Sequence, residues 1–230
     1  MGHPSDWDEV RASLGEYETS AIAIEAANSW DEGIHELAKK TPERSVLIGY
    51  SMGARLALAL ALEFSERYEA LVFISGNPGL KSDVLREQRS AHDARIAERL
   101  ESEPRIQFLT EWYESPVFNG LSPSVRAEEI QRKAARSGHD WPAILRTNSV
   151  AKQPNYWNRL SELAIPVLAL AGALDPMYAE VIERFDGACD SACAEIIPDC
   201  GHIVHREQPR QFIRVLREFL ARLGASTKPH

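Results

Sequence analysis

Cysteine is scarce in this sequence, which has only Cys189, Cys193 and Cys200 among its 230 residues. Three cysteines cannot form a fully paired disulfide framework, and this agrees with a reducing compartment. With His202 they form the pattern C-x3-C-x6-C-x-H, but that spacing fits no standard zinc site. The sequence therefore predicts free thiols, no bound metal and no other cofactor.

An excess of basic residues and long apolar runs are also lacking. The net charge is -8, which argues against a nucleic-acid partner. The longest apolar run covers residues 56–62, far short of the ~20 residues that cross a membrane. The N-terminus lacks the basic start and apolar core of a signal peptide. These absences predict a cytoplasmic protein with no nucleic-acid or membrane partner.

What the sequence does contain is enough apolar residues, 44% of the chain, for one full-sized globular core. Near-continuous apolar runs, typical of strands covered on both faces, occur at residues 20–24, 45–50, 70–76, 165–172 and 194–198. Helical patterns lie between them, at residues 30–40, 52–66, 177–185 and 208–223. This alternation predicts an α/β fold with a mostly parallel sheet.

The pattern changes in the middle of the chain. Strand-like runs disappear between residues 81 and 157, and charged, arginine-rich helical stretches replace them. "SGNPGLKSD" supplies turn residues before this region, and "AIPVLAL" marks the return to the sheet. We therefore predict a core formed by residues 1–80 and 158–230, with residues 81–157 as a helical cap inserted into it.

One short motif carries the chemistry. Residues 49–53 read Gly-Tyr-Ser-Met-Gly, a G-x-S-x-G pattern with a predicted strand before it and a predicted helix after it. In that context the flanking glycines Gly49 and Gly53 allow a sharp turn that exposes the Ser51 hydroxyl. The backbone N–H of Met52, at the start of the helix, is then available to stabilise a developing oxyanion.

A nucleophilic serine needs a base, and the base needs an orienting carboxylate. Asp175 directly follows the predicted strand at 165–172, and His202 follows the last predicted strand. Both should therefore lie at the same sheet edge as Ser51. His205 is an alternative base and Asp199 an alternative carboxylate; Gly201 beside His202 favours His202, and Asp199 is too close to His202 in sequence.

Six segments together resemble one branch of the α/β-hydrolase superfamily. They are "GYSMGAR", "SGNPGL", "WYESPVF", "SVAKQPNYW", "AGALDPMY" and "GHIVHREQP". The serine and histidine segments identify the superfamily, whereas "SGNPGL", "WY-x-x-PVF" and "S-V-x-x-QP" are similar to the branch that makes 2-succinyl-6-hydroxy-2,4-cyclohexadiene-1-carboxylate in menaquinone biosynthesis. The resemblance runs in order over nearly the whole chain.

The resemblance implies a lyase with an α/β-hydrolase fold. In such an enzyme the Ser-His-Asp triad acts as a base that removes a ring proton, and pyruvate leaves by elimination from a succinyl-enolpyruvyl-hydroxycyclohexene carboxylate. No water is consumed. The oxyanion donors would stabilise enolate-like charge as the proton leaves.

A substrate with several carboxylates requires cations in the site. By resemblance these are Arg55, one helical turn after Ser51, then Arg89 in the cap, and Lys133 or its neighbour Arg132. The resemblance also assigns Tyr50, Trp112 and Phe118 to the apolar walls. Two alternatives remain: Arg55 forms an ion pair with an acidic neighbour, or the cap arginines form a solvated helix face with Arg86, Arg95 and Arg99.

The N-terminus departs from the family pattern. The chain begins "MGHPSDWDEV", which resembles the end of a His-Gly loop that supplies the second oxyanion donor in the family, without the strands before it. By resemblance, one missing strand belongs between residues 20–24 and 45–50. We therefore expect an N-terminally truncated fold, with Met1 as an internal methionine of a longer product.

Two other functional classes remain open at this stage. The same triad serves a serine hydrolase, such as a carboxylesterase, thioesterase or C-C bond hydrolase, and an incomplete oxyanion hole would leave a catalytically impaired binding protein. Arg55 favours the lyase. The sequence leaves the exact substrate open, and whether the chain forms a homo-oligomer.

Overall fold

A parallel sheet forms the centre of the computed structural model, which describes residues 2–136 and 140–226. In these residues the sheet has four strands in the order β1-β2-β3-β4. They are β1 (Ser45–Tyr50), β2 (Tyr68–Ile74), β3 (Val167–Gly172) and β4 (Ala192–Ile197). All carboxyl ends of the strands therefore lie at one edge, where parallel α/β sheets bind ligands.

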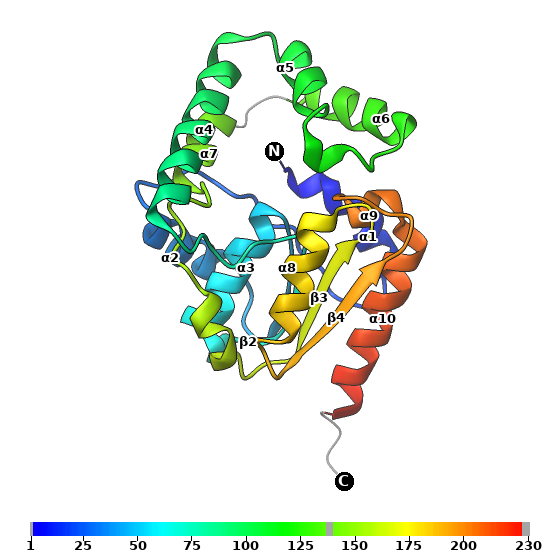
Figure 1. Ribbon diagram of the computed structural model, residues 1–230. Helices are drawn as coiled ribbons and strands as arrows, with labels where there is room; N and C mark the ends of the chain where they lie inside the picture. Colours follow the sequence, from blue (N-terminus) through cyan, green and yellow to red (C-terminus); the bar gives the residue numbers. More distant parts are fainter. Residues whose placement is uncertain (1, 137–139, 227–230) are drawn as a thin grey trace.

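Helices cover both faces of the sheet (Figure 1). Outside the cap they are η1 (Pro4–Trp7), α1 (Asp8–Ser13), α2 (Trp30–Lys40), α3 (Met52–Glu63), η2 (Ser65–Arg67), α8 (Pro176–Asp186), α9 (Val204–Glu207) and α10 (Pro209–Ser226). One apolar cluster joins α2, α3 and α8 to one face, and a second joins α1 and α10 to the other. Alternate residues of β2 and β3 enter the two clusters, which explains their continuous apolar sequence.

The cap lies between β2 and β3 in the chain and above the carboxyl ends of the strands (Figure 1). Its elements are α4 (Asp83–Ser102), α5 (Arg105–Trp112), η3 (Pro116–Phe118), α6 (Pro123–Ala134) and α7 (Trp141–Thr147), followed by η4 (Trp157–Glu162). A third apolar cluster holds the cap together and includes Ile203 of the core. The cap is thereby packed against the residue next to His202.

Most of the expected elements are found, but one is wrong. The predicted strands at 45–50, 70–76, 165–172 and 194–198 correspond to β1 to β4. Residues 20–24 form no strand; Ile22 and Ile24 pack against the first apolar cluster instead. A strand requires a hydrogen-bonded neighbour, and within the described residues β1 pairs only with β2.

Within residues 2–136 and 140–226, every helix is too short or too polar to span a membrane.

Candidate active site

The turn between β1 and α3 is sharp and centred on Ser51. Ser51 has φ 52° and ψ -110°, a backbone conformation that non-glycine residues adopt rarely. Its N–H donates to the Ile74 carbonyl of β2 at 2.8 Å. A Cβ at Gly49 would lie 2.3 Å from the Gly53 carbonyl oxygen, so residue 49 must be glycine, whereas a Cβ at Gly53 would meet open space. Space therefore requires glycine at residue 49 but not at residue 53.

Three side chains from three different strand ends meet at this turn. His202 Nδ1 lies 2.6 Å from Asp175 Oδ2, and His202 Nε2 lies 3.3 Å from Ser51 Oγ. Asp175 and His202 are both 4% exposed, so their bond is shielded from water and strengthened accordingly. The arrangement has the contacts of a serine, base and orienting carboxylate.

The two alternative residues lie elsewhere. His205 is buried between Trp7, whose ring stacks on it at 4.7 Å, and Tyr50, whose ring centre is 5.0 Å away. Among the described residues its Nδ1 has no hydrogen-bond partner, and burial lowers the pKa of His205 to about 3. Asp199 is exposed. The geometry thus favours His202 and Asp175.

Aromatic rings surround His202. The ring centres of Tyr178, Tyr50 and Phe118 lie 4.7, 5.3 and 5.9 Å from the imidazole, and Trp112 lies 6.1 Å from Phe118. Burial raises the pKa of Tyr50 and of Tyr178, so both phenols stay neutral. Tyr50 and Phe118 thus lie beside His202, and Trp112 lies one ring further away; their role as walls of a substrate site stays a prediction. Tyr178 was not anticipated from the sequence.

Arg55 lies one turn after Ser51, where its N–H donates to the Ser51 carbonyl at 3.3 Å. The guanidinium donates to the backbone oxygen of Asn148 at 2.7 Å and to Gln153 Oε1 at 3.0 Å, and it lies over the Trp30 ring at 5.8 Å. Burial lowers its pKa to about 10, so it remains charged near neutral pH. Its hydrogen-bonding partners are neutral, and the expected alternative of a direct ion pair is not found among the described residues.

Arg89 is placed near Arg55 by a buried carboxylate. Arg89 Nε donates to Asp93 Oδ1 at 2.8 Å, and Ser149 Oγ donates to Asp93 Oδ2 at 2.6 Å. The charge of Arg89 adds to the effect of burial in lowering the pKa of Arg55, so the two cations share one electrostatic environment. Asp93 was not anticipated from the sequence, although Ser149 and Gln153 belong to the "S-V-x-x-QP" segment.

Lys133 belongs to a different group of charges. Its Nζ lies 3.3 Å from Glu129 Oε2 and 3.5 Å from Asp6 Oδ2, and Arg132 contacts the same two carboxylates. Burial lowers the pKa of Lys133 against the effect of these carboxylates. Lys133 and Arg132 thus have counter-ions within the protein, and a substrate role for either stays a prediction.

The start of α3 is suited to hold negative charge. Met52 is the first residue of this helix, so its N–H has no acceptor within the helix. The positive end of the helix dipole adds to the attraction for an anion at this point. The assignment of Met52 as an oxyanion donor stays a prediction.

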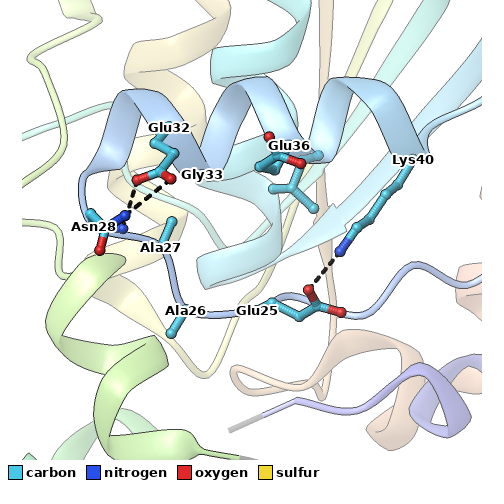
Figure 2. Close-up of a pocket in the computed structure, with 9 residues that line it drawn as sticks. Glu25, Ala26, Ala27, Asn28, Glu32, Gly33, Glu36 and Lys40 are labelled. Atoms are coloured by element: carbon cyan, nitrogen blue, oxygen red, sulfur yellow. Dashed lines mark hydrogen bonds and ion pairs between the residues drawn. The ribbon is translucent and has the colours of Figure 1, made fainter.

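A metal centre and a surface hollow are the other kinds of site for which the described residues can be searched. In residues 2–136 and 140–226, no group of His, Cys, Asp or Glu is arranged to hold a metal ion. A hollow of about 270 Å³ lies beside α2 (Figure 2). Its charged residues have partners in the protein: Lys40 pairs with Glu25 at 2.7 Å, and Glu32 accepts from the Asn28 N–H at 2.9 Å.

The sequence profile of the α/β hydrolase family matches residues 2–215. The chain belongs to this family. Among solved structures, MenH from S. aureus is similar with a TM-score of 0.86 and 22% identity, covering 96% of this chain and 90% of that one. A thermophilic esterase from Thermogutta terrifontis is similar with a TM-score of 0.72 and 24% identity, covering 96% and 86%. These likenesses confirm the fold.

Relatives that are similar in sequence indicate which branch of the α/β hydrolase family this chain resembles. The 2-succinyl-6-hydroxy-2,4-cyclohexadiene-1-carboxylate synthase of Serratia proteamaculans (strain 568) is 35% identical over 238 residues, covering 97% of this chain and 91% of that protein. A Bacillus subtilis (strain 168) relative is 36% identical over 185 residues, which span 76% of this chain and 65% of that protein. The resemblance identified from the sequence motifs is therefore confirmed.

Proposed function

We propose that this chain is a lyase that eliminates pyruvate from a succinyl-enolpyruvyl-hydroxycyclohexene carboxylate in menaquinone biosynthesis. The name of the Serratia relative supports the pathway. The site itself supports a substrate rich in carboxylates, because two arginines accompany the serine, histidine and aspartate.

Arg55 is the observation that carries this proposal. A buried charge costs several kcal/mol unless a counter-charge or strong hydrogen bonds offset it. The hydrogen bonds of Arg55 go to the neutral oxygens of Asn148 and Gln153. A substrate carboxylate would supply the missing negative charge, one helical turn from Ser51. An ester with a neutral acyl chain would supply no negative charge there.

The geometry is suited to a proton abstraction. His202 Nε2, 3.3 Å from Ser51 Oγ, accepts the hydroxyl proton, while Asp175 stabilises the resulting imidazolium through Nδ1. The Ser51 alkoxide then removes the ring proton next to the succinyl carbonyl. The electron pair released forms a ring double bond next to the succinyl carbonyl, the existing ring double bond shifts along the ring, and the bond between the ring carbon and the enolpyruvyl oxygen breaks. The enolate of pyruvate leaves and takes up a proton on its methylene carbon, the proton being the one that His202 accepted. The Met52 N–H stabilises the enolate-like oxygen during this step.

Pyruvate release tests this proposal. Purified protein is incubated with the enolpyruvyl substrate, and pyruvate is followed by coupling to lactate dehydrogenase and NADH. We expect release by the wild type and none above background by Ser51→Ala. A p-nitrophenyl ester is assayed in parallel. Ester turnover without pyruvate release would reject the lyase in favour of a hydrolase, and neither activity from folded protein would indicate an impaired enzyme.

A further inference from the structure

Glu207, the last residue of α9, binds the backbone on both sides of His202. Its Oε2 accepts the N–H of Gly201 at 2.8 Å, and its Oε1 accepts the N–H of Ile203 at 2.7 Å. A single carboxylate therefore uses both of its oxygens to hold the residues before and after the imidazole. Charged acceptors form stronger hydrogen bonds than neutral ones.

The carbonyl groups of the segment that carries His202 are bonded as well: Gln208 Nε2 donates to the Asp199 oxygen at 3.0 Å, and the Arg206 N–H donates to the Ile203 oxygen at 2.8 Å. This segment connects β4 to α9, a helix of four residues, and passes through Asp199 at φ 51°. The Cys200 carbonyl accepts the Leu174 N–H at 2.8 Å, which ties the segment to the loop of Asp175. In the described part of the chain, the N–H groups of Gly201 and Ile203 donate to no backbone oxygen. Glu207 is thus what satisfies these two donors.

The negative charge of Glu207 also reaches the site. Burial is the main cause of the raised pKa of the Tyr50 phenol, and the charge of Glu207 adds to it. The centre of the Tyr50 ring is 5.3 Å from that of the His202 ring. Glu207 makes no ion pair within 4 Å among the described residues, so its charge is not cancelled by a nearby cation. Glu207 therefore adds negative charge to the surroundings of Tyr50, whose ring lies beside His202.

We propose that Glu207 is the positioning residue for His202: by holding the N–H groups on both sides of it, Glu207 fixes the imidazole at its distance from Ser51. The inference rests on the proposed function for the role of His202 as the base. It applies to any reaction that uses this serine and histidine.

The packing at Gly201 supports this role. A Cβ at Gly201 would lie 3.0 Å from Glu207 Oε2 and 3.2 Å from Oε1. Any larger residue there would push the carboxylate away from the two N–H groups that it binds. The Gly201→Ala variant therefore displaces the clamp while leaving its charge in the protein.

The test is the reaction of Ser51 with a fluorophosphonate probe, in which Ser51 Oγ bonds to phosphorus, fluoride leaves and His202 takes the proton. Labelling of Glu207→Gln is followed by intact mass across a pH series. We expect labelling slower by roughly 10- to 100-fold, because a small misplacement of a base is costly.

Glu218→Gln is the matched control, because Glu218 is an exposed carboxylate on α10 with one surface ion pair. It should label like the wild type. A labelling rate equal to that of the wild type in folded Glu207→Gln would overturn the inference. If Glu207→Gln does not fold, Gly201→Ala takes its place, and wild-type labelling by that variant would overturn the inference equally.

A second readout separates this inference from the proposed function. The downfield proton resonance of the His202 Nδ1–H, shared with Asp175, reports the position of the imidazole without any substrate. We expect it to shift or broaden in Glu207→Gln, and an unchanged resonance would contradict the clamp. Failure of the wild type to release pyruvate would reject the lyase alone, because labelling and the resonance do not depend on it.

Discussion

Arg55 of α3 donates to the side-chain oxygen of Gln153 across 3.0 Å. This bond joins the helix that follows Ser51 to the chain that returns from the cap, 98 residues later. Both acceptors of the guanidinium are neutral. The positive charge beside the serine is therefore positioned from two directions. In the described residues no carboxylate lies within 4 Å of the guanidinium, and the buried Asp93 acts on it only from a greater distance.

Replacing Arg55 should separate two activities. We expect Arg55→Ala to reduce kcat/KM for pyruvate elimination by roughly 100-fold, because a buried charge interaction with a substrate carboxylate is lost. Hydrolysis of a p-nitrophenyl ester, which has no such carboxylate, should fall far less. Equal losses in the two assays would mean that Arg55 is structural.

Arg89 and Arg95 form a matched pair on α4. Arg89 is held by the buried Asp93, whereas Arg95 is exposed. We expect Arg89→Ala to raise KM for the polycarboxylate by about tenfold, a modest effect because the side chain is partly exposed. Arg95→Ala should leave KM unchanged. Steady-state kinetics of the two variants measure this difference. If neither substitution changes KM, the cap arginines form only a solvated helix face.

The two glycines of the motif should behave in opposite ways. Gly49→Ala would place a Cβ 2.3 Å from a backbone oxygen, and we expect it to lower the free energy of unfolding by about 3 kcal/mol or more. Gly53→Ala enters open space within α3 and should raise Tm by about 2–4 °C through helix propensity. Thermal unfolding measures both. A Tm for Gly49→Ala equal to that of the wild type would contradict the close packing of α3 on β1.

His205 should make the protein sensitive to acid. Its pKa is lowered to about 3 by burial, below the ordinary value of 6.5, so the unfolded chain binds the proton first as pH falls. The resulting stability is complete above pH 6.5 and is lost progressively toward pH 3. At pH 5 the loss is about 2 kcal/mol.

Urea unfolding at pH 7 and pH 5 measures this effect. The decrease in the free energy of unfolding should be about 2 kcal/mol smaller in His205→Phe than in the wild type. His92→Gln, which changes an exposed histidine of α4, should show the wild-type decrease. The same decrease in all three proteins would argue that His205 is not a buried neutral histidine.

Local sequence signals predicted the elements that depend on local interactions. The helix expected at residues 30–40 is α2 (Trp30–Lys40), with Ser29 as its N-cap. The placement of Asp175 and His202 near Ser51 followed from strand ends that share one sheet edge. Residues 20–24 have strand-like composition but no strand beside them, and such pairing is not encoded in the segment itself. The partners of Arg55 lie 93 and 98 residues further along the sequence, and hydrophobic periodicity gives no information on contacts between residues so far apart in the chain.

The mass of the ring product tests the central claim most directly. Elimination removes the whole of pyruvic acid and leaves a cyclohexadiene, whereas hydrolytic loss of the enolpyruvyl group leaves a hydroxyl and a product heavier by one water. Mass spectrometry of the reaction with wild-type protein distinguishes the two, with Ser51→Ala as the blank. We predict the cyclohexadiene, formed in equal amount to pyruvate and absent from the blank. A product that retains the added water, or no ring product from folded protein, would contradict the account.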